Sequence, residues 1–330
     1  MDKFKAFRIN EVDKKTVAAF VDMTLDDLDP GEVVIRVAYS GVNYKDALAA
    51  TGAGKIIRRF PCVGGIDLSG TVVESGDARF KKGDAVIATS YDIGVAHHGG
   101  YAEYARVPAD WVVPMPRGLN LFEAMALGTA GYTAALGVVR MQANGLAPAN
   151  GPVIVSGASG GVGSIAVDIL AGLGYHVVAL TGKEGETDYL KGLGAKEVKL
   201  RQSLDLAKIR PLDKALWAGA VDSLGGEVLA WIASTMLQGG TIASIGLAAS
   251  PTLNTTVLPF ILRGACLLGI DSGSTPMPLR QQVWQHLATD MKPRHLAGMT
   301  RTIAFEHLPG VFDDFIKGNA KGRIVVDLAA

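Results

Sequence analysis

The sequence predicts an α/β protein of two domains, the first made of short strands and the second of alternating strands and helices. Three observations lead to this fold class. The chain has 330 residues, roughly twice the length of a typical single domain. Up to about residue 120, short strand-like runs are separated by glycine and proline, whereas strands and helices alternate after it. A glycine-rich turn joins the first strand and helix of the second part.

The amino-acid composition excludes several classes of function. Lys+Arg and Asp+Glu both number 32, and this balance argues against a nucleic-acid partner. Hydrophobic residues make up 48% and charged residues 19%, which excludes disorder and allows a large core. The N-terminus lacks an apolar signal segment, and the uncharged run 228–262 is interrupted by glycine and proline. We therefore predict a cytoplasmic protein without a nucleic-acid or membrane partner.

The first domain, predicted over 1–121, is expected to be a small barrel or sandwich. Turn signals such as Lys82-Gly83-Asp84 separate its strands. The predicted strands are Glu32–Tyr39, Gly70–Glu74, Asp84–Ala88 and Trp111–Val113. A short helix, Tyr44–Ala50, is expected directly after the strand that ends at Asn43.

The second domain, predicted over 122–272, is expected to be a doubly wound parallel sheet. A long apolar helix, Leu121–Val139, leads into it, and strands then alternate with helices at the spacing of βαβ units. The predicted strands are Val153–Ser156, His176–Leu180, Glu197–Leu200, Ala220–Asp222, Thr241–Ile245 and Cys266–Ile270. Helices are predicted at Val162–Leu173 and Thr187–Leu193.

The remaining segment, 273–330, is too short to form a domain of its own. It is expected to pack back onto the first domain, which would make the second domain an insertion. Its predicted elements are a helix at Leu279–Met291, a strand at Arg301–Phe305, a helix at Val311–Lys317 and a strand at Arg323–Leu328.

A glycine loop after the strand Val153–Ser156 indicates dinucleotide binding. Glycines 157, 160 and 163 form G-x-x-G-x-x-G directly before a helix. Such glycines permit a tight turn, close approach of the backbone to a pyrophosphate, and close helix–strand packing. The N-terminus of the helix adds unpaired N–H groups and a positive dipole for the anion.

The end of the next strand favours NADPH over NADH. An enzyme that uses NAD usually carries Asp or Glu about 20 residues after the glycines, to bind the ribose 2′-hydroxyl. Here Thr181-Gly182-Lys183 occupies that place, and Arg201 follows the third strand. A hydroxyl and two cations suit a 2′-phosphate. The alternative for Lys183 is an ordinary solvated loop lysine.

The arrangement resembles the medium-chain dehydrogenase/reductase superfamily over essentially the whole chain. The resemblance implies a GroES-like β-barrel catalytic domain, completed by the C-terminal segment, and a Rossmann domain between them. In zinc-dependent members, a cysteine and a histidine that bind catalytic zinc occupy the positions of Asn43 and Ile66. The chain has only two cysteines, Cys62 and Cys266, and no cysteine-rich loop for structural zinc. We therefore predict no metal.

Without a Lewis acid, reduction of an activated C=C bond is easier than dehydrogenation of an alcohol. The motifs Asn43–Leu48, Gly54–Arg58, Phe60-Pro61, Gly65–Asp67 and Trp217–Gly219 resemble the acrylyl-CoA reductase group of the zinc-independent quinone oxidoreductase branch. This resemblance implies hydride transfer from NADPH to the β-carbon of acrylyl-CoA, giving propionyl-CoA. The alternatives are a quinone reductase and a non-catalytic NADPH-binding protein of the crystallin type.

The resemblance also implies the site residues. Tyr44 is the candidate for contact with the nicotinamide and the substrate, or else a packing residue. Asn43 either orients the thioester oxygen or caps the helix after it, while Asp46 braces the loop. Arg323 is left open between a substrate contact and a structural role. The expected cofactor-binding residues are Tyr44, Ser159, Gly160, Gly161, Val162, Thr181, Gly182, Lys183, Arg201, Leu247, Ile261, Ser272 and Asn319.

The apolar segment Ala265–Ile270 is expected to form an open edge of the parallel sheet. Exposed apolar edges tend to be covered, and members of the superfamily commonly join two sheets across a dyad. We therefore predict a homodimer that acts on a small-molecule acyl-CoA.

Overall fold

The computed structural model describes residues 3–328, and the chain divides into two compact units. Unit 1 consists of Met1–Thr129, Gly273–Ala288 and Leu296–Ala330. Unit 2 consists of Ala130–Ser272 and Thr289–His295. The predicted domain limits fall after residues 121 and 272, whereas these units divide after residues 129 and 272, with 289–295 added to unit 2.

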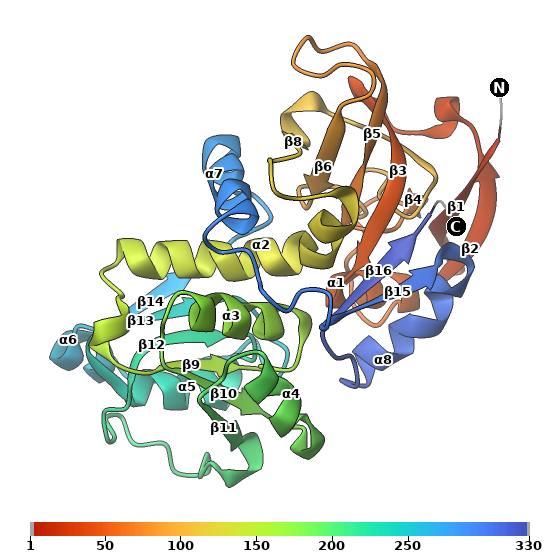
Figure 1. Cartoon of the computed structure of the whole chain (residues 1–330). Coiled ribbons are helices and arrows are strands. Elements are labelled where there is room, and N and C mark those ends of the chain that lie inside the picture. The colour runs from red at the N-terminus through yellow and green to blue at the C-terminus, as the bar shows by residue number, and fades with distance from the viewer. Residues whose placement is uncertain (1–2, 329–330) are drawn as a thin grey trace. The chain divides into compact units, whose positions relative to one another are not determined.

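Unit 1 contains two β-sheets (Figure 1). One has seven strands in the order β15-β16-β3-β5-β6-β8, with β7 also paired to β3, and the other has three in the order β2-β1-β4. The strands are β1 Phe4–Val12, β2 Lys15–Met23, β3 Val33–Val42, β4 Cys62–Val63, β5 Asp67–Ser75, β6 Ala85–Thr89, β7 Tyr104–Val107, β8 Val112–Pro114, β15 Thr300–Ala304 and β16 Arg323–Asp327. Its helices are α1 Tyr44–Thr51, α7 Met277–Ala288 and α8 Phe312–Ile316.

The last strand of the chain joins the sheet of the first part. β16 pairs antiparallel with β3, with Ile324 opposite Val42 and Asp327 opposite Tyr39. The side chains of Ile324, Val325 and Val326 are buried, which anchors the C-terminal segment in unit 1.

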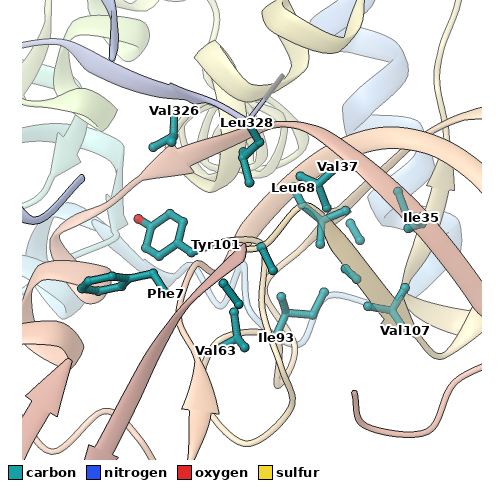
Figure 2. Packing of buried hydrophobic residues seen from close by; sticks show 14 of the residues in the cluster. Phe7, Ile35, Val37, Val63, Leu68, Ile93, Tyr101, Val107, Val326 and Leu328 are labelled. Atoms are coloured by element: carbon teal, nitrogen blue, oxygen red, sulfur yellow. The ribbon is translucent and has the colours of Figure 1, made fainter. Parts of the chain in front are cut away.

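One cluster of buried apolar side chains joins the two sheets of unit 1. Figure 2 shows Phe7 of β1 close to Tyr101, with Val326 and Leu328 near the end of β16 and Val37 on β3. Aromatic contacts extend this core, because the rings of Phe7 and Tyr101 lie 6.5 Å apart and nearly perpendicular.

The structure contains a hairpin of β1 and β2 that was not predicted from the sequence. Its strands are joined at Asp13 and Lys14, whose φ angles are 51° and 62°. Both residues therefore adopt the left-handed conformation that two-residue hairpin turns need, without the Asn-Gly or Asp-Gly signal that usually marks such a turn.

Unit 2 contains a parallel six-stranded sheet in the order β11-β10-β9-β12-β13-β14. The strands are β9 Val153–Ser156, β10 Val177–Thr181, β11 Glu197–Leu200, β12 Trp217–Asp222, β13 Met236–Ser244 and β14 Cys266–Gly269. The helices are α3 Gly161–Gly172, α4 Thr187–Gly192, α5 Gly226–Ser234 and α6 Leu258–Arg263 (Figure 1). Because β10 and β12 lie on opposite sides of β9, the strand order reverses there, and the predicted doubly wound fold is confirmed.

Helix α2 (Leu121–Ala143) belongs to both units, which divide between Thr129 and Ala130. Its backbone is not helical at Gly128, where φ is 51° and ψ is −155°. Within residues 3–328 it is the one helix long and apolar enough to cross a membrane, and 78% of its apolar window is buried inside the protein. Such burial is typical of a core helix.

Candidate functional site

The glycine loop between β9 and α3 has little room for side chains. Gly157 has a φ of 61°, a conformation that glycine adopts readily. A Cβ atom on Gly163 would lie 2.3 Å from the carbonyl oxygen of Gly157, so the helix can pack this closely only with glycine there. The Gly160 N–H donates to that same oxygen at 3.0 Å, which closes the turn.

Helix α3 begins at Gly161, directly after this turn, and Gly160 is its N-cap. The first N–H groups of a helix lack partners within the helix and carry partial positive charge. Gly160, Gly161 and Val162 are partly exposed, whereas the middle of α3 is buried against the sheet. The loop therefore presents backbone donors on a rigid base, as a pyrophosphate requires.

The Thr181–Lys183 segment at the end of β10 is tied to the glycine loop. The Thr181 and Ser159 hydroxyl oxygens lie 3.3 Å apart, and both side chains are buried. Thr181 Oγ1 also accepts a hydrogen bond from the Lys183 N–H at 3.1 Å. Three predicted residues, Ser159, Thr181 and Lys183, are thus joined by contacts at Thr181 Oγ1.

Arg201 follows β11, which pairs with β10. Leu200, the last residue of β11, lies opposite Thr181 of β10. Its exposed side chain reaches back to Gly182, and its guanidinium lies 3.5 Å from where a Cβ atom of Gly182 would be. Arg201 and Lys183 therefore both lie at Gly182, whereas the first acidic residue, Glu184, comes after Lys183. This set of side chains fits a phosphate and does not fit the carboxylate recognition of a 2′-hydroxyl.

Leu247 lies at the same, carboxyl end of the sheet. A Cβ atom on the preceding Gly246 would lie 2.6 Å from the Ser223 carbonyl oxygen, and one on Gly157 would lie 3.4 Å from the Ser223 Cβ. The loop after β13 and the glycine loop therefore both contact Ser223. The Leu247 side chain itself is 62% exposed.

The other two residues predicted in unit 2 have different surroundings. Ile261 is on α6 and is 67% exposed. Ser272 Oγ accepts a hydrogen bond from Thr133 Oγ1 of α2 at 2.7 Å.

Asn43, Tyr44 and Asn319 belong to unit 1. Tyr44 is the first residue of α1 and is 44% exposed, which is more than a tyrosine packed in the core would show. Helix α1 packs against α8, and exposed Asn319 follows α8, where its N–H donates to the Asp314 carbonyl at 2.7 Å.

Asn43 is buried, and its side chain is fully occupied by neighbours in unit 1. Its Nδ2 donates to Asp46 Oδ2 at 3.1 Å and to Asp67 Oδ2 at 2.8 Å. Its Oδ1 accepts from Arg323 Nη1 at 3.3 Å. Of the two roles left open for Asn43, these bonds support the structural one, at the N-terminus of α1.

Asp46 braces the segment before Tyr44. Its carboxylate accepts the Asn43 N–H at 2.8 Å and the Ile66 N–H at 3.0 Å. Burial, together with the negative charge of Asp67, raises the pKa of Asp46 to about 7.

Asp67 and Arg323 supply the hydrogen bonds missing at the break in α2. Asp67 accepts from the Thr129 N–H at 2.8 Å, and Arg323 Nε donates to the Ala126 carbonyl at 2.9 Å. A Cβ atom on Gly128 would lie 2.5 Å from Asp67 Oδ2. Arg323 is 2% exposed, so the structure assigns it the structural role. Sequence reasoning missed this cluster; the available signal was the glycine content of the predicted helix, since Gly128, Gly131 and Gly137 each lower its helix propensity.

Asn43 and Ile66, which the resemblance places at the positions of zinc ligands in the zinc-dependent enzymes, lie within this cluster. Within the described residues, 3–328, no three His, Cys, Asp or Glu side chains are grouped so that they could hold a metal ion. Burial raises the pKa of the Cys62 thiol to about 12, so this thiol stays protonated at neutral pH.

Two family models match the chain. The model of the alcohol dehydrogenase GroES-like domain matches residues 29–117, and the model described as zinc-binding dehydrogenase matches residues 161–289. They correspond to parts of unit 1 and unit 2, respectively.

Full-length relatives are also similar. The acrylyl-CoA reductase AcuI of Ruegeria pomeroyi is 46% identical over 97% of both chains. The crystal structure of Escherichia coli K-12 YhdH with bound NADPH has a TM-score of 0.95 at 45% identity, covering 98% of this chain and 99% of that one. The putative quinone oxidoreductase YhfP of Bacillus subtilis is 49% identical over 93% of both chains, and its structure with NAD bound has a TM-score of 0.97 at 46% identity, covering 99% and 100%.

Proposed function

Because the chain belongs to the acrylyl-CoA reductase group of the zinc-independent medium-chain dehydrogenase/reductases, we propose that it reduces the C=C bond of acrylyl-CoA to give propionyl-CoA. The observation that carries this proposal is the 46% identity with AcuI over 97% of both chains. The thioester carbonyl conjugated to this bond accepts the charge that develops when the β-carbon is reduced, so the reaction does not require a Lewis acid.

NADPH is the cofactor, and when bound it supplies the hydride. The glycine loop fits a dinucleotide, since its helix packs against a turn so closely that a side chain on Gly163 would collide with Gly157. We propose that Ser159, Gly160, Gly161 and Val162 hold the pyrophosphate. The 2′-phosphate would be held by Thr181, Gly182, Lys183 and Arg201.

In unit 1, we propose that Tyr44 contacts the nicotinamide and the substrate. Its exposed phenol is a hydrogen-bond donor on the first turn of a helix whose start is braced by Asp46. Asn43 takes part as a positioning residue, because its amide joins this start to Asp67 and Arg323. We also propose Leu247, Ile261, Ser272 and Asn319 as cofactor contacts, with Leu247 beside the nicotinamide.

Parallel assays with acrylyl-CoA and a benzoquinone test the proposal. We expect NADPH oxidation with acrylyl-CoA, formation of propionyl-CoA, and far lower turnover of the quinone. Preferential reduction of the quinone would instead favour the activity named for YhfP, which is 49% identical. Absence of turnover with either substrate and with other enones would favour a non-catalytic NADPH-binding protein.

We also propose a homodimer that pairs through β14, the edge strand of the unit 2 sheet. Exposed apolar side chains support it: Leu267 on β14 is 38% exposed, and Leu262 on α6 is 57% exposed. A cytoplasmic location stays a prediction from the sequence.

A further inference from the structure

Gln202 lies beside the proposed phosphate site but is not among its predicted residues. It follows Arg201 in η5 (Arg201–Ser203), the 3₁₀ turn after β11. Its Nε2 donates a hydrogen bond to the carbonyl oxygen of Gly182 at 2.9 Å. This bond ties the turn that carries Arg201 to the segment that carries Lys183.

The bond fixes one particular peptide group. The Gly182 carbonyl and the Lys183 N–H belong to the same planar unit. Gln202 binds its oxygen, and Thr181 Oγ1 accepts its N–H at 3.1 Å. A peptide held at both polar atoms sets the direction in which the Lys183 side chain leaves the backbone.

The same contact orders the arginine. Gln202 and Arg201 are consecutive and exposed, and the Arg201 guanidinium lies along Gly182. Ser203 Oγ completes the turn by donating to the Leu200 carbonyl at 2.7 Å. Lys183 and Arg201 are thereby held at the same backbone segment before any ligand binds. Because both side chains are already ordered, less conformational entropy is lost when they bind an anion.

We propose that Gln202 is a positioning residue for the selection of NADPH over NADH, a role that rests on the proposed function. Its amide carries no charge and acts through the Gly182 peptide, which holds Lys183 and Arg201 ready for a phosphomonoester dianion. NADH lacks this phosphate, so loosening the support should weaken NADPH binding and leave NADH binding nearly unchanged.

Binding titrations without substrate test the proposal, with NADPH and NADH each added to wild type, Gln202→Ala and Gln202→Glu. Loss of one neutral, solvent-exposed hydrogen bond should weaken NADPH binding by about two- to tenfold. Gln202→Glu should weaken it further, since a carboxylate cannot donate to the Gly182 oxygen and repels the phosphate. Gln238→Ala is the matched control, because it removes the same side chain from an exposed position of β13, outside this turn, and should keep the wild-type ratio of the two affinities.

A double-mutant cycle identifies the route of the effect. If Gln202 acts through Lys183, Gln202→Ala should cost less NADPH affinity in a Lys183→Ala background than in wild type. Equal losses for NADPH and NADH in Gln202→Ala, or an unchanged ratio of affinities, would overturn the inference. A wild-type protein that binds NADH as tightly as NADPH would contradict the proposed function itself, so the two failures are distinguishable.

Discussion

At the scale of single residues, Lys183 gives the most direct test of cofactor choice. Lys183→Ala removes one of the two cations beside Gly182 and leaves the glycine loop intact. A charge-assisted hydrogen bond contributes about 1.5–3 kcal/mol, so we expect Kd for NADPH to rise about ten- to a hundredfold, with NADH almost unaffected. Titration of both cofactors measures this. Lys191→Ala, at an exposed lysine in the last turn of α4, is the control, and equal losses for both cofactors in Lys183→Ala would contradict the assignment.

The raised pKa of Asp46 predicts that the free energy of unfolding depends on pH. Its pKa is raised to about 7 from an ordinary value of 3.8, so between these values the folded state holds a proton that the unfolded chain has released. Its contribution therefore stabilises the fold at low pH and is lost as the pH rises through 7, with a size on the order of 4 kcal/mol.

Denaturant unfolding at pH 5 and pH 8 measures this contribution. The wild type should lose more free energy of unfolding between the two pH values than Asp46→Asn, which has no carboxyl group to titrate at this position. Parallel losses in the two proteins would show that Asp46 titrates near its ordinary value.

Residues at strand ends could be predicted, whereas residues joined by long-range contacts could not. Thr181 ends β10, Lys183 comes two residues after it, and Arg201 follows β11; the fold places such positions at one edge of the sheet. The hydrogen bond of Asp67 to Asn43 and that of Arg323 to Ala126 join parts of the chain 24 and 197 residues apart, and no local pattern encodes them. In the sequence, nothing distinguishes Gln202 from other exposed polar residues; only the structure shows its hydrogen bond to the Gly182 carbonyl.

At the scale of elements, the break in α2 depends on Gly128. Gly128→Ala places a Cβ atom 2.5 Å from Asp67 Oδ2 on a backbone with φ of 51°. Left-handed strain and overpacking together should lower the free energy of unfolding by about 2–5 kcal/mol. Chemical denaturation measures the change, with Gly192→Ala in α4 as the control because a Cβ atom there meets nothing within 4 Å. A variant as stable as wild type would contradict the close contact with Asp67.

In unit 2, the strands β9, β10 and β12 could be predicted because they are buried apolar runs, whereas the helices α5 and α6 were not predicted. In unit 1, the hairpin of β1 and β2 and the short strand β7 were missed. Asp13 and Lys14 form the hairpin turn without a glycine, and β7 has four residues, too few to show a period.

At the scale of the whole molecule, prolonged treatment with a strong chelator should leave acrylyl-CoA reduction unchanged. The positions of Asn43 and Ile66 offer no ligand of the kind that zinc prefers. Elemental analysis of the purified protein should find no stoichiometric zinc. Activity lost on chelation and restored by added zinc would overturn this prediction.

Assembly is tested at Leu267, the exposed apolar side chain on β14. The alternating burial along this strand leaves Leu268 less exposed, so Leu267 is the better site for a charge. Leu267→Lys should shift sedimentation at micromolar concentration from dimer toward monomer. Val12→Lys, at a 52% exposed residue in unit 1, should leave the dimer intact. A monomeric wild type would exclude the model.

The pairing of β16 with β3 has a consequence for biosynthesis. A ribosome delivers β3 before β16, and Arg323 of β16 donates a hydrogen bond to the Val42 carbonyl of β3 across 281 positions of the chain. All six strands of unit 2 emerge between them and can pair while β3 still lacks this neighbour. Until Arg323 arrives, Asp46 and Asp67 lack their buried cation, and Asn43 lacks one of its partners. The cluster around Asn43 is therefore completed only after β16 has been synthesised, so a translation product that stops before β16 can hold a finished parallel sheet without this cluster.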